Sequence, residues 1–270
     1  MIAAAPSAED LFFESVASQS LQDWNKGKRF KIADDKFLLV TECDNPPSLS
    51  KDDIIEFVEV YPRPGVDGQE KTILKFRSSS NEIKYTIERP IEESLKSIKP
   101  EDIPMLIDMD LVESAKQKLK GKKLWTRTAL WYDDTLAYKA GRKFAPVTVT
   151  EVSSGNAFFP LKITFQDEKG LRGNLLMNTG TSGNESRNFG KLFSLTDPKN
   201  SYKNISPEVW EAIQNERLMN GMTKEECKLS IGTPNEVETG HNYSNALEIW
   251  YYSDGAYLRF IDGILVNFKK

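Results

Sequence analysis

Residues 247–268 read LEIWYYSDGAYLRFIDGILVNF, and this stretch decides the fold of the C-terminal part of the chain. Two turn signals, Ser253-Asp254-Gly255 and Asp262-Gly263, divide it into runs rich in aromatic and branched side chains. Such runs are typical of strands, and turns this short join neighbouring antiparallel strands. The stretch therefore predicts a β-meander.

Alternation along the first of these strands assigns its side chains to two faces. Leu247, Ile249 and Tyr251 share one face, and Trp250 and Tyr252 share the other. We expect the first set to pack on helices and the two aromatics to face outward. Because large aromatic side chains anchor interfaces, Trp250 and Tyr252 are candidate binding residues, with an interdomain contact as the alternative.

Two helices are expected before the meander. The first carries Trp210 and Leu218 near one face and is expected to end at Asn220-Gly221. The second is expected to begin with the capping box Thr223-Lys224-Glu225-Glu226, in which hydroxyl and carboxylate satisfy each other's backbone amides. We expect this second helix to end near Gly232, where a glycine can cap it.

Four stretches of the C-terminal segment follow one another in a recognisable order. They are GMTKEE (residues 221–226), IGTPNEV (231–237), WYY (250–252) and FIDGILV (260–266). Together they resemble the SmpA/OmlA family, which includes the small lipoprotein of the outer-membrane β-barrel assembly machinery. The resemblance covers about residues 210–270 and implies an exported, protein-binding module. It places the chain in the cell envelope, at the periplasm or outer membrane, or outside the cell.

The sequence upstream of this segment repeats itself. A basic turn motif recurs, and two strand-like runs recur with a common offset of 89 residues (147 minus 58, and 165 minus 76). Clusters of turn residues separate the runs, so each copy predicts a small, strongly bent sheet or barrel, with an SH3-like barrel as one candidate. The matched residues are Lys26 and Lys120, Val58 and Val147, and Phe76 and Phe165.

These features divide the chain into three expected domains and predict a β-rich α+β fold. Residues 20–120 form the first β-rich repeat, residues 121–205 the second, and residues 206–270 the helix–helix–meander module. The first repeat is expected to close with a helix that opens near Lys99-Pro100 and ends before Gly121. The apolar residues of this helix are Met105, Met109, Val112, Ala115 and Leu119.

The charge balance and the cysteines exclude several classes of protein. Lys and Arg number 36 against 40 Asp and Glu, giving a net charge of -4, which lacks the basic footprint of a nucleic-acid-binding protein. No apolar run approaches the roughly 18–20 residues of a membrane span, so none is expected. Cys43 and Cys227 lie in different expected domains and are predicted to be free thiols.

No catalytic constellation is apparent, so we expect no enzyme, no cofactor and no metal site. His241, the single histidine, lies in a polar stretch expected to be an exposed loop. The segment from Asn178 resembles an aspartic protease loop, but an amide cannot share a proton as that carboxylate pair does. Asp52-Asp53 and Asp133-Asp134 are expected to be turn carboxylates. A hydrolase of cell-wall glycans or peptides, with carboxylates assembled across domains, is the alternative.

Aromatic residues give the best interaction hypothesis for the second repeat as well. Trp131 and Tyr132 lie in its opening strands and join Trp250 and Tyr252 as candidate binding residues, with core packing as the competing interpretation. The partner expected for these residues is a protein or a cell-wall polymer. The sequence therefore favours a non-catalytic binding or scaffolding protein.

Overall fold

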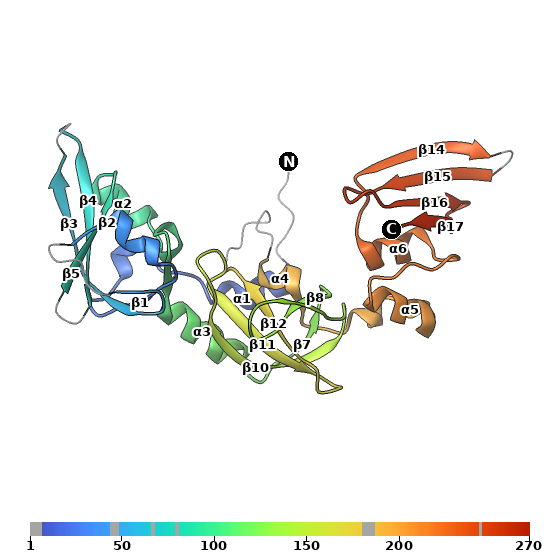
Figure 1. Ribbon diagram of the computed structural model, residues 1–270, viewed down its shortest axis with the longest axis horizontal. Coiled ribbons are helices and arrows are strands. Elements are labelled where there is room, and N and C mark those ends of the chain that lie inside the picture. The colour runs from blue at the N-terminus through green and yellow to red at the C-terminus, as the bar shows by residue number, and fades with distance from the viewer. Residues whose placement is uncertain (1–6, 44–48, 66–67, 79–80, 180–186, 243–244) are drawn as a thin grey trace. The chain divides into compact units, whose positions relative to one another are not determined.

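The computed structural model shows a β-rich α+β protein with two curled half-barrel sheets and a few helices, which confirms the expected class (Figure 1). It describes residues 7–43, 49–65, 68–78, 81–179, 187–242 and 245–270. The chain divides into two compact units. Unit 1 comprises Met1–Lys122, Thr148–Gln166 and Asn174–Leu192, and unit 2 comprises Lys123–Val147, Asp167–Gly173 and Phe193–Lys270.

The first sheet lies in unit 1 and has the antiparallel strand order β2-β5-β4-β3-β1-β6. Its strands are β1 (Arg29–Ile32), β2 (Thr41–Glu42), β3 (Ile54–Pro64), β4 (Glu70–Ser78), β5 (Asn81–Ile87) and β6 (Leu106–Asp108). Alternation turns Phe30, Phe57 and Phe76 into one buried cluster with Trp24. The ring centroids of Trp24 lie 5.0 Å from Phe30 and 5.3 Å from Phe57, within the range of favourable aromatic pairs.

The helices of unit 1 are α1 (Ala8–Glu14), α2 (Ile91–Ser97), α3 (Met109–Leu119) and α4 (Phe189–Leu192). The closing helix of the first repeat was expected to begin at Lys99-Pro100, but it does not begin there. A single 3-10 turn forms at Pro100–Asp102, Met105 adopts a left-handed conformation with φ 64°, and the strand β6 follows. The helix α3 begins only where Asp108 accepts a hydrogen bond from a backbone amide of the first turn. Gly121, with φ 79°, follows its end as expected.

A buried ion pair fixes the start of α3. The Lys28 Nζ atom lies 2.8 Å from the Asp108 carboxylate and 3.0 Å from that of Asp110. Burial raises the pKa of Asp108, although the lysine opposes this effect. Lys28, which lies in the first basic turn motif Lys26-Gly27-Lys28-Arg29-Phe30, therefore holds the carboxylate that caps the helix.

The middle sheet has the strand order β13-β7-β10-β11-β12-β8-β9. Its strands are β7 (Lys123–Thr126), β8 (Leu130–Tyr132), β9 (Tyr138–Ala140), β10 (Pro146–Ser154), β11 (Leu161–Asp167), β12 (Arg172–Met177) and β13 (Phe193–Ser194). The strands β8 and β9 form a hairpin in unit 2.

The C-terminal part of unit 2 contains two helices, α5 (Pro207–Gln214) and α6 (Lys224–Ile231), followed by a sheet in the order β14-β15-β16-β17. The capping box at Thr223 is present, and Gly232 ends α6 with φ 93°, which confirms both expectations. The helix α5, by contrast, ends well before Asn220-Gly221. Glu216 adopts a left-handed conformation with φ 52°, which an α-helix cannot continue through.

The C-terminal sheet confirms the meander and adds a strand to it. Its strands are β14 (Glu236–Asn242), β15 (Asn245–Tyr251), β16 (Tyr257–Ile261) and β17 (Ile264–Lys269). The strand β14 was not expected, because its sequence is polar and resembles a loop; as an edge strand, it needs few apolar side chains. His241 is therefore an exposed strand residue rather than a loop residue.

Candidate functional site: the open face of the C-terminal sheet

The placement of Trp250 reverses the faces expected for the meander. Trp250 is only 1% exposed, and its ring centroid lies 4.6 Å from that of Phe260 in the core beneath the sheet. The Lys228 Nζ atom of α6 lies 5.2 Å from the same ring, at cation–π distance, and the indole N–H donates to the Glu248 carboxylate. The expectation that Trp250 faces outward is therefore wrong.

A polar residue on the helix-packed face explains this reversal. Glu248 shares that face with Trp250, so the alternation looked more apolar on the opposite side. Its carboxylate is satisfied by Trp250 and by the Lys224 ammonium, and although burial alone would raise the pKa of Glu248, these partners hold it below its ordinary value. A carboxylate paired in this way can lie at the rim of a core.

Tyr252 also serves the structure rather than an outward surface. It follows the end of β15 and is half-buried, and its hydroxyl donates to the Gly232 carbonyl at 3.1 Å. Burial raises the pKa of Tyr252 to about 12. This bond links Tyr252, which directly follows β15, to Gly232 at the end of α6.

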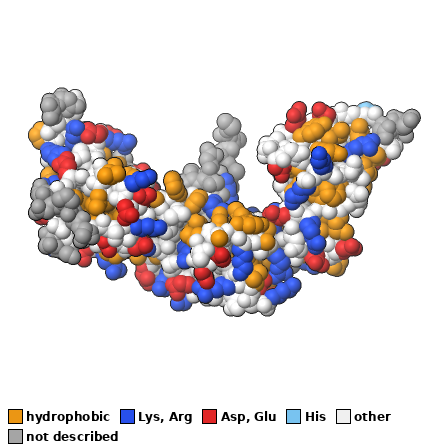
Figure 2. Space-filling view, in the orientation of Figure 1, with side chains coloured by type: hydrophobic (Ala, Val, Ile, Leu, Met, Phe, Trp, Pro, Cys, Tyr) orange, Lys and Arg blue, Asp and Glu red, His pale blue; other side chains and the backbone are white. Residues whose placement is uncertain are grey.

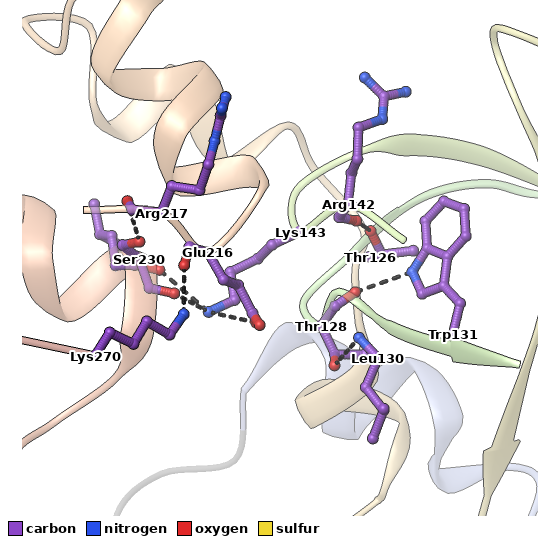
Figure 3. A network of polar contacts seen from close by, with 11 residues as sticks. Thr126, Thr128, Leu130, Trp131, Arg142, Lys143, Glu216, Arg217, Ser230 and Lys270 are labelled. Atoms are coloured by element: carbon purple, nitrogen blue, oxygen red, sulfur yellow. Dashed lines mark hydrogen bonds and ion pairs between the residues drawn. The ribbon is translucent and has the colours of Figure 1, made fainter. Parts of the chain in front are cut away.

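Trp131 lies in a core position as well. It is fully buried, and its indole N–H donates to the Thr128 carbonyl at 3.0 Å (Figure 3). The ring lies against the backbone of Gly141, where an added Cβ would be only 2.1 Å away. Tyr132, by contrast, is half-exposed and lies directly opposite Tyr138, which is 67% exposed. Of the four candidate aromatics, Tyr132 therefore has the environment that best suits binding.

A polar network joins the β8–β9 hairpin region to the C-terminal helices within unit 2 (Figure 3). The Lys143 ammonium donates to the Ser230 carbonyl at 2.8 Å and lies 3.5 Å from the Glu216 carboxylate. Burial lowers the pKa of Lys143, and the Glu216 carboxylate offsets this effect in part. A cation at the last carbonyls of α6 complements the helix dipole, so this network is structural.

The face of the C-terminal sheet that turns away from the helices carries a group of apolar side chains, with Asn267 and Lys269 on its β17 side. Strand register places β15 residues between those of β14 and β16, with Leu247 opposite Ile261, Ile249 opposite Arg259, and Tyr251 opposite Tyr257. Hydrophobic side chains gather over these strands in Figure 2. The apolar residues of this surface, which we call the open face, are Leu247, Ile249, Tyr251, Tyr257, Ile261 and Ile264.

The open face also carries charges. Arg259 lies in its middle and is half-buried, and its side chain makes no hydrogen bond or ion pair within the described part of the chain. Glu236 and Glu238 lie on the edge strand, and Glu238 accepts a hydrogen bond from the Tyr251 hydroxyl at 3.1 Å. Sequence reasoning missed Arg259 and Tyr257, although the alternation of β16 places them on one face once the register is known.

The candidate chemical residues are structural where the structure describes them. Asp52 pairs with the Lys31 ammonium at 2.6 Å, and this hydrogen bond lowers the pKa of Asp52. Asp133 accepts hydrogen bonds from Thr135 and Ala137, which lower its pKa and close a turn. Both are turn carboxylates, as expected. Within the described residues, Cys43 and Cys227 form no disulfide, in agreement with the predicted thiols.

A pocket of about 210 Å³ in unit 1 brings two carboxylates to one place. Glu101 and Asp108 line it, together with Phe158, which is 84% exposed. The Asp108 carboxylate, however, is already bound by Lys28 and by the Asp110 amide. Asn178 lines the same pocket; the glycine and the following residues of its loop lie outside the described residues. Among the described residues, no three His, Cys, Asp or Glu side chains gather as metal ligands would.

Comparisons with protein families, with curated proteins and with solved structures found no match. The resemblance of the C-terminal segment to the SmpA/OmlA family stays a prediction. Across the ranges that the structure describes, no helix is both long and apolar enough to cross a membrane.

Proposed function

We propose that this chain is a non-catalytic binding or scaffolding protein, and that it binds a protein partner through the open face of its C-terminal sheet. The observation that carries the proposal is the group of six apolar side chains on that face. The other face of the same sheet already packs Trp250, Leu258 and Phe260 into the core. In an antiparallel sheet with one packed face, the second face is ordinarily polar.

The aromatic and cationic residues of the open face suit a protein interface. Tyr251 and Tyr257 lie directly opposite each other, and Arg259 lies beside them. Tyrosine and arginine are enriched among the residues that contribute most to protein–protein binding. A row of large apolar side chains favours a protein partner over a cell-wall polymer, because a polymer site would need more hydrogen-bonding groups.

Site-specific photo-crosslinking in the full chain tests this function. A photoreactive residue in place of Ile249 should yield a protein adduct in an envelope extract, because Ile249 lies in the centre of the open face. The same residue in place of Glu208, an exposed position on α5, serves as the matched control. If position 249 gives no more adduct than position 208, the open face is not a binding surface.

We further propose that the first and middle sheets are copies of one SH3-like unit. The order β6-β1-β3-β4-β5-β2 corresponds strand for strand to β13-β7-β10-β11-β12-β8, with β9 as an addition. A short helical turn precedes the last strand of each sheet, at Pro100–Asp102 and at Phe189–Leu192. An experimental structure in which the two sets of strands fail to superimpose would refute the repeat.

The cell envelope, or the space outside the cell, is part of the proposal and follows from the resemblance of the C-terminal segment. Fractionation of cells that express the full chain tests it, since a chain found only in the cytosol contradicts this location.

The hydrolase alternative would have to use Glu101 and Asp108 of the unit 1 pocket. The ion pair of Asp108 with Lys28 argues against that use. If an Asp108→Asn variant digests envelope material as the original chain does, the hydrolase alternative is excluded.

A further inference from the structure

We propose that the open face of the C-terminal sheet pairs with the open face of a second copy of this chain. The inference rests on the proposed function, because it names the partner of the same surface. It is carried by the order of side chains across the sheet, which is self-complementary about the strand β15. Symmetric dimers use one patch twice, so residues on either side of the axis must match each other.

The central row of the open face carries opposite charges on either side of β15. Register places Glu238 of β14 beside Ile249 of β15, and Ile249 beside Arg259 of β16. When two such sheets lie face to face across a two-fold axis that runs along β15, each Arg259 lies over the second copy's Glu238. The two copies of Ile249 then meet at the axis. The pairing forms two equivalent ion pairs from one sequence.

The rows on either side match in the same way. Leu247 meets its own copy, and Ile261 lies over Gly240, which leaves room for the larger side chain. Tyr251 meets its own copy in the next row, and Tyr257 lies over Glu236, which can accept from its hydroxyl. Large residues thus face small or apolar ones, and donors face acceptors, throughout these three rows.

Arg259 supplies the reason to expect a partner at this face. It is half-buried, lies between Ile249 and Asn267 in the register, and has no ion pair or hydrogen bond from the described residues of its own chain. An incompletely solvated guanidinium gains from a carboxylate held opposite it. Glu238 is exposed and retains acceptor capacity beside its bond from Tyr251. Two aligned sheets pack about 10 Å apart, a gap that long side chains such as these span.

Charge reversal in the full chain tests the pairing. Arg259→Glu and Glu238→Arg should each raise the dimer dissociation constant at least about tenfold, because like charges then face each other at both symmetric positions. An equimolar mixture of the two variants should form a heterodimer, since both of its ion pairs are intact. The double variant, with the two charges exchanged, should dimerise like the original chain. Sedimentation velocity over a dilution series measures all four.

The control variant is Glu208→Arg, which reverses an exposed charge on α5 and should leave dimerisation unchanged. The proposal is overturned when the original chain is monomeric throughout the series, when both single variants dimerise normally, or when their mixture does not associate. A monomeric chain whose Ile249 position still crosslinks to another protein overturns the second copy as occupant while leaving the proposed function in place. Absence of both signals removes the two together.

Discussion

Replacing Trp250 by alanine tests the reversed faces of the C-terminal sheet most directly. Trp250 is 1% exposed, packs on Phe260 and lies below the Lys228 ammonium. Truncating a buried tryptophan costs about 3–5 kcal/mol, and losing the cation–π contact adds at least ~0.5–1 kcal/mol. We therefore expect Trp250→Ala to lower the free energy of unfolding by about 4–5 kcal/mol. Such a loss is a large part of the ~5–15 kcal/mol that stabilises a domain.

Hydrogen exchange followed by mass spectrometry measures this loss locally, on peptides that cover β15, β16 and β17. At 1.4 kcal/mol for each factor of ten, a loss of about 4–5 kcal/mol should lower amide protection in these strands roughly 700- to 4,000-fold. Ile249→Ala, one residue away on the open face, is the matched variant and should change protection by less than about fivefold. Repeating the measurement at two protein concentrations separates folding from association. Equal effects of the two substitutions, or a larger effect of Ile249→Ala, would refute the assignment of faces.

Three further predictions concern single residues. Thr223→Ala should destabilise α6 by about 1 kcal/mol in urea titration, because the hydroxyl cap is lost, whereas Thr223→Ser should keep most of it. Gly141→Ala should cost more than ~2 kcal/mol, since the new Cβ would overlap the Trp131 ring, and a smaller loss would show that the hairpin can shift. Burial raises the pKa of Cys227 to about 12, so its thiol should resist iodoacetamide at pH 8 until the protein unfolds. Labelling of native Cys227 at pH 8 would contradict its burial. Because the pKa of Cys227 is higher in the folded than in the unfolded state, its contribution to stability is fully present below about pH 9. That contribution is lost as the pH rises towards 12.

Local signals in the sequence predicted those elements whose causes are themselves local. The capping box at Thr223, the glycine at position 232 and the two meander turns depend on residues within a few positions of each other, and the structure contains them all. The predicted end of α5 was wrong because the left-handed conformation of Glu216 has no signature in the sequence. The late start of α3 depends on the tertiary pair of Lys28 with Asp108, which lies far along the chain.

The candidate site failed for a different reason, which concerns the faces of a strand. Alternation assigns residues to two faces but does not say which face is buried. Glu248 made the Trp250 face look polar, although its carboxylate is neutralised by Lys224 and bound by the indole N–H. Trp250 belongs to the core and Tyr252 packs against it, so the surface predicted around them gives way to the proposed open face on the opposite side of the sheet. Because neighbouring residues of a strand point to opposite faces, Trp250 facing inward requires Ile249 to face outward. The pair Trp250→Ala and Ile249→Ala therefore tests both placements.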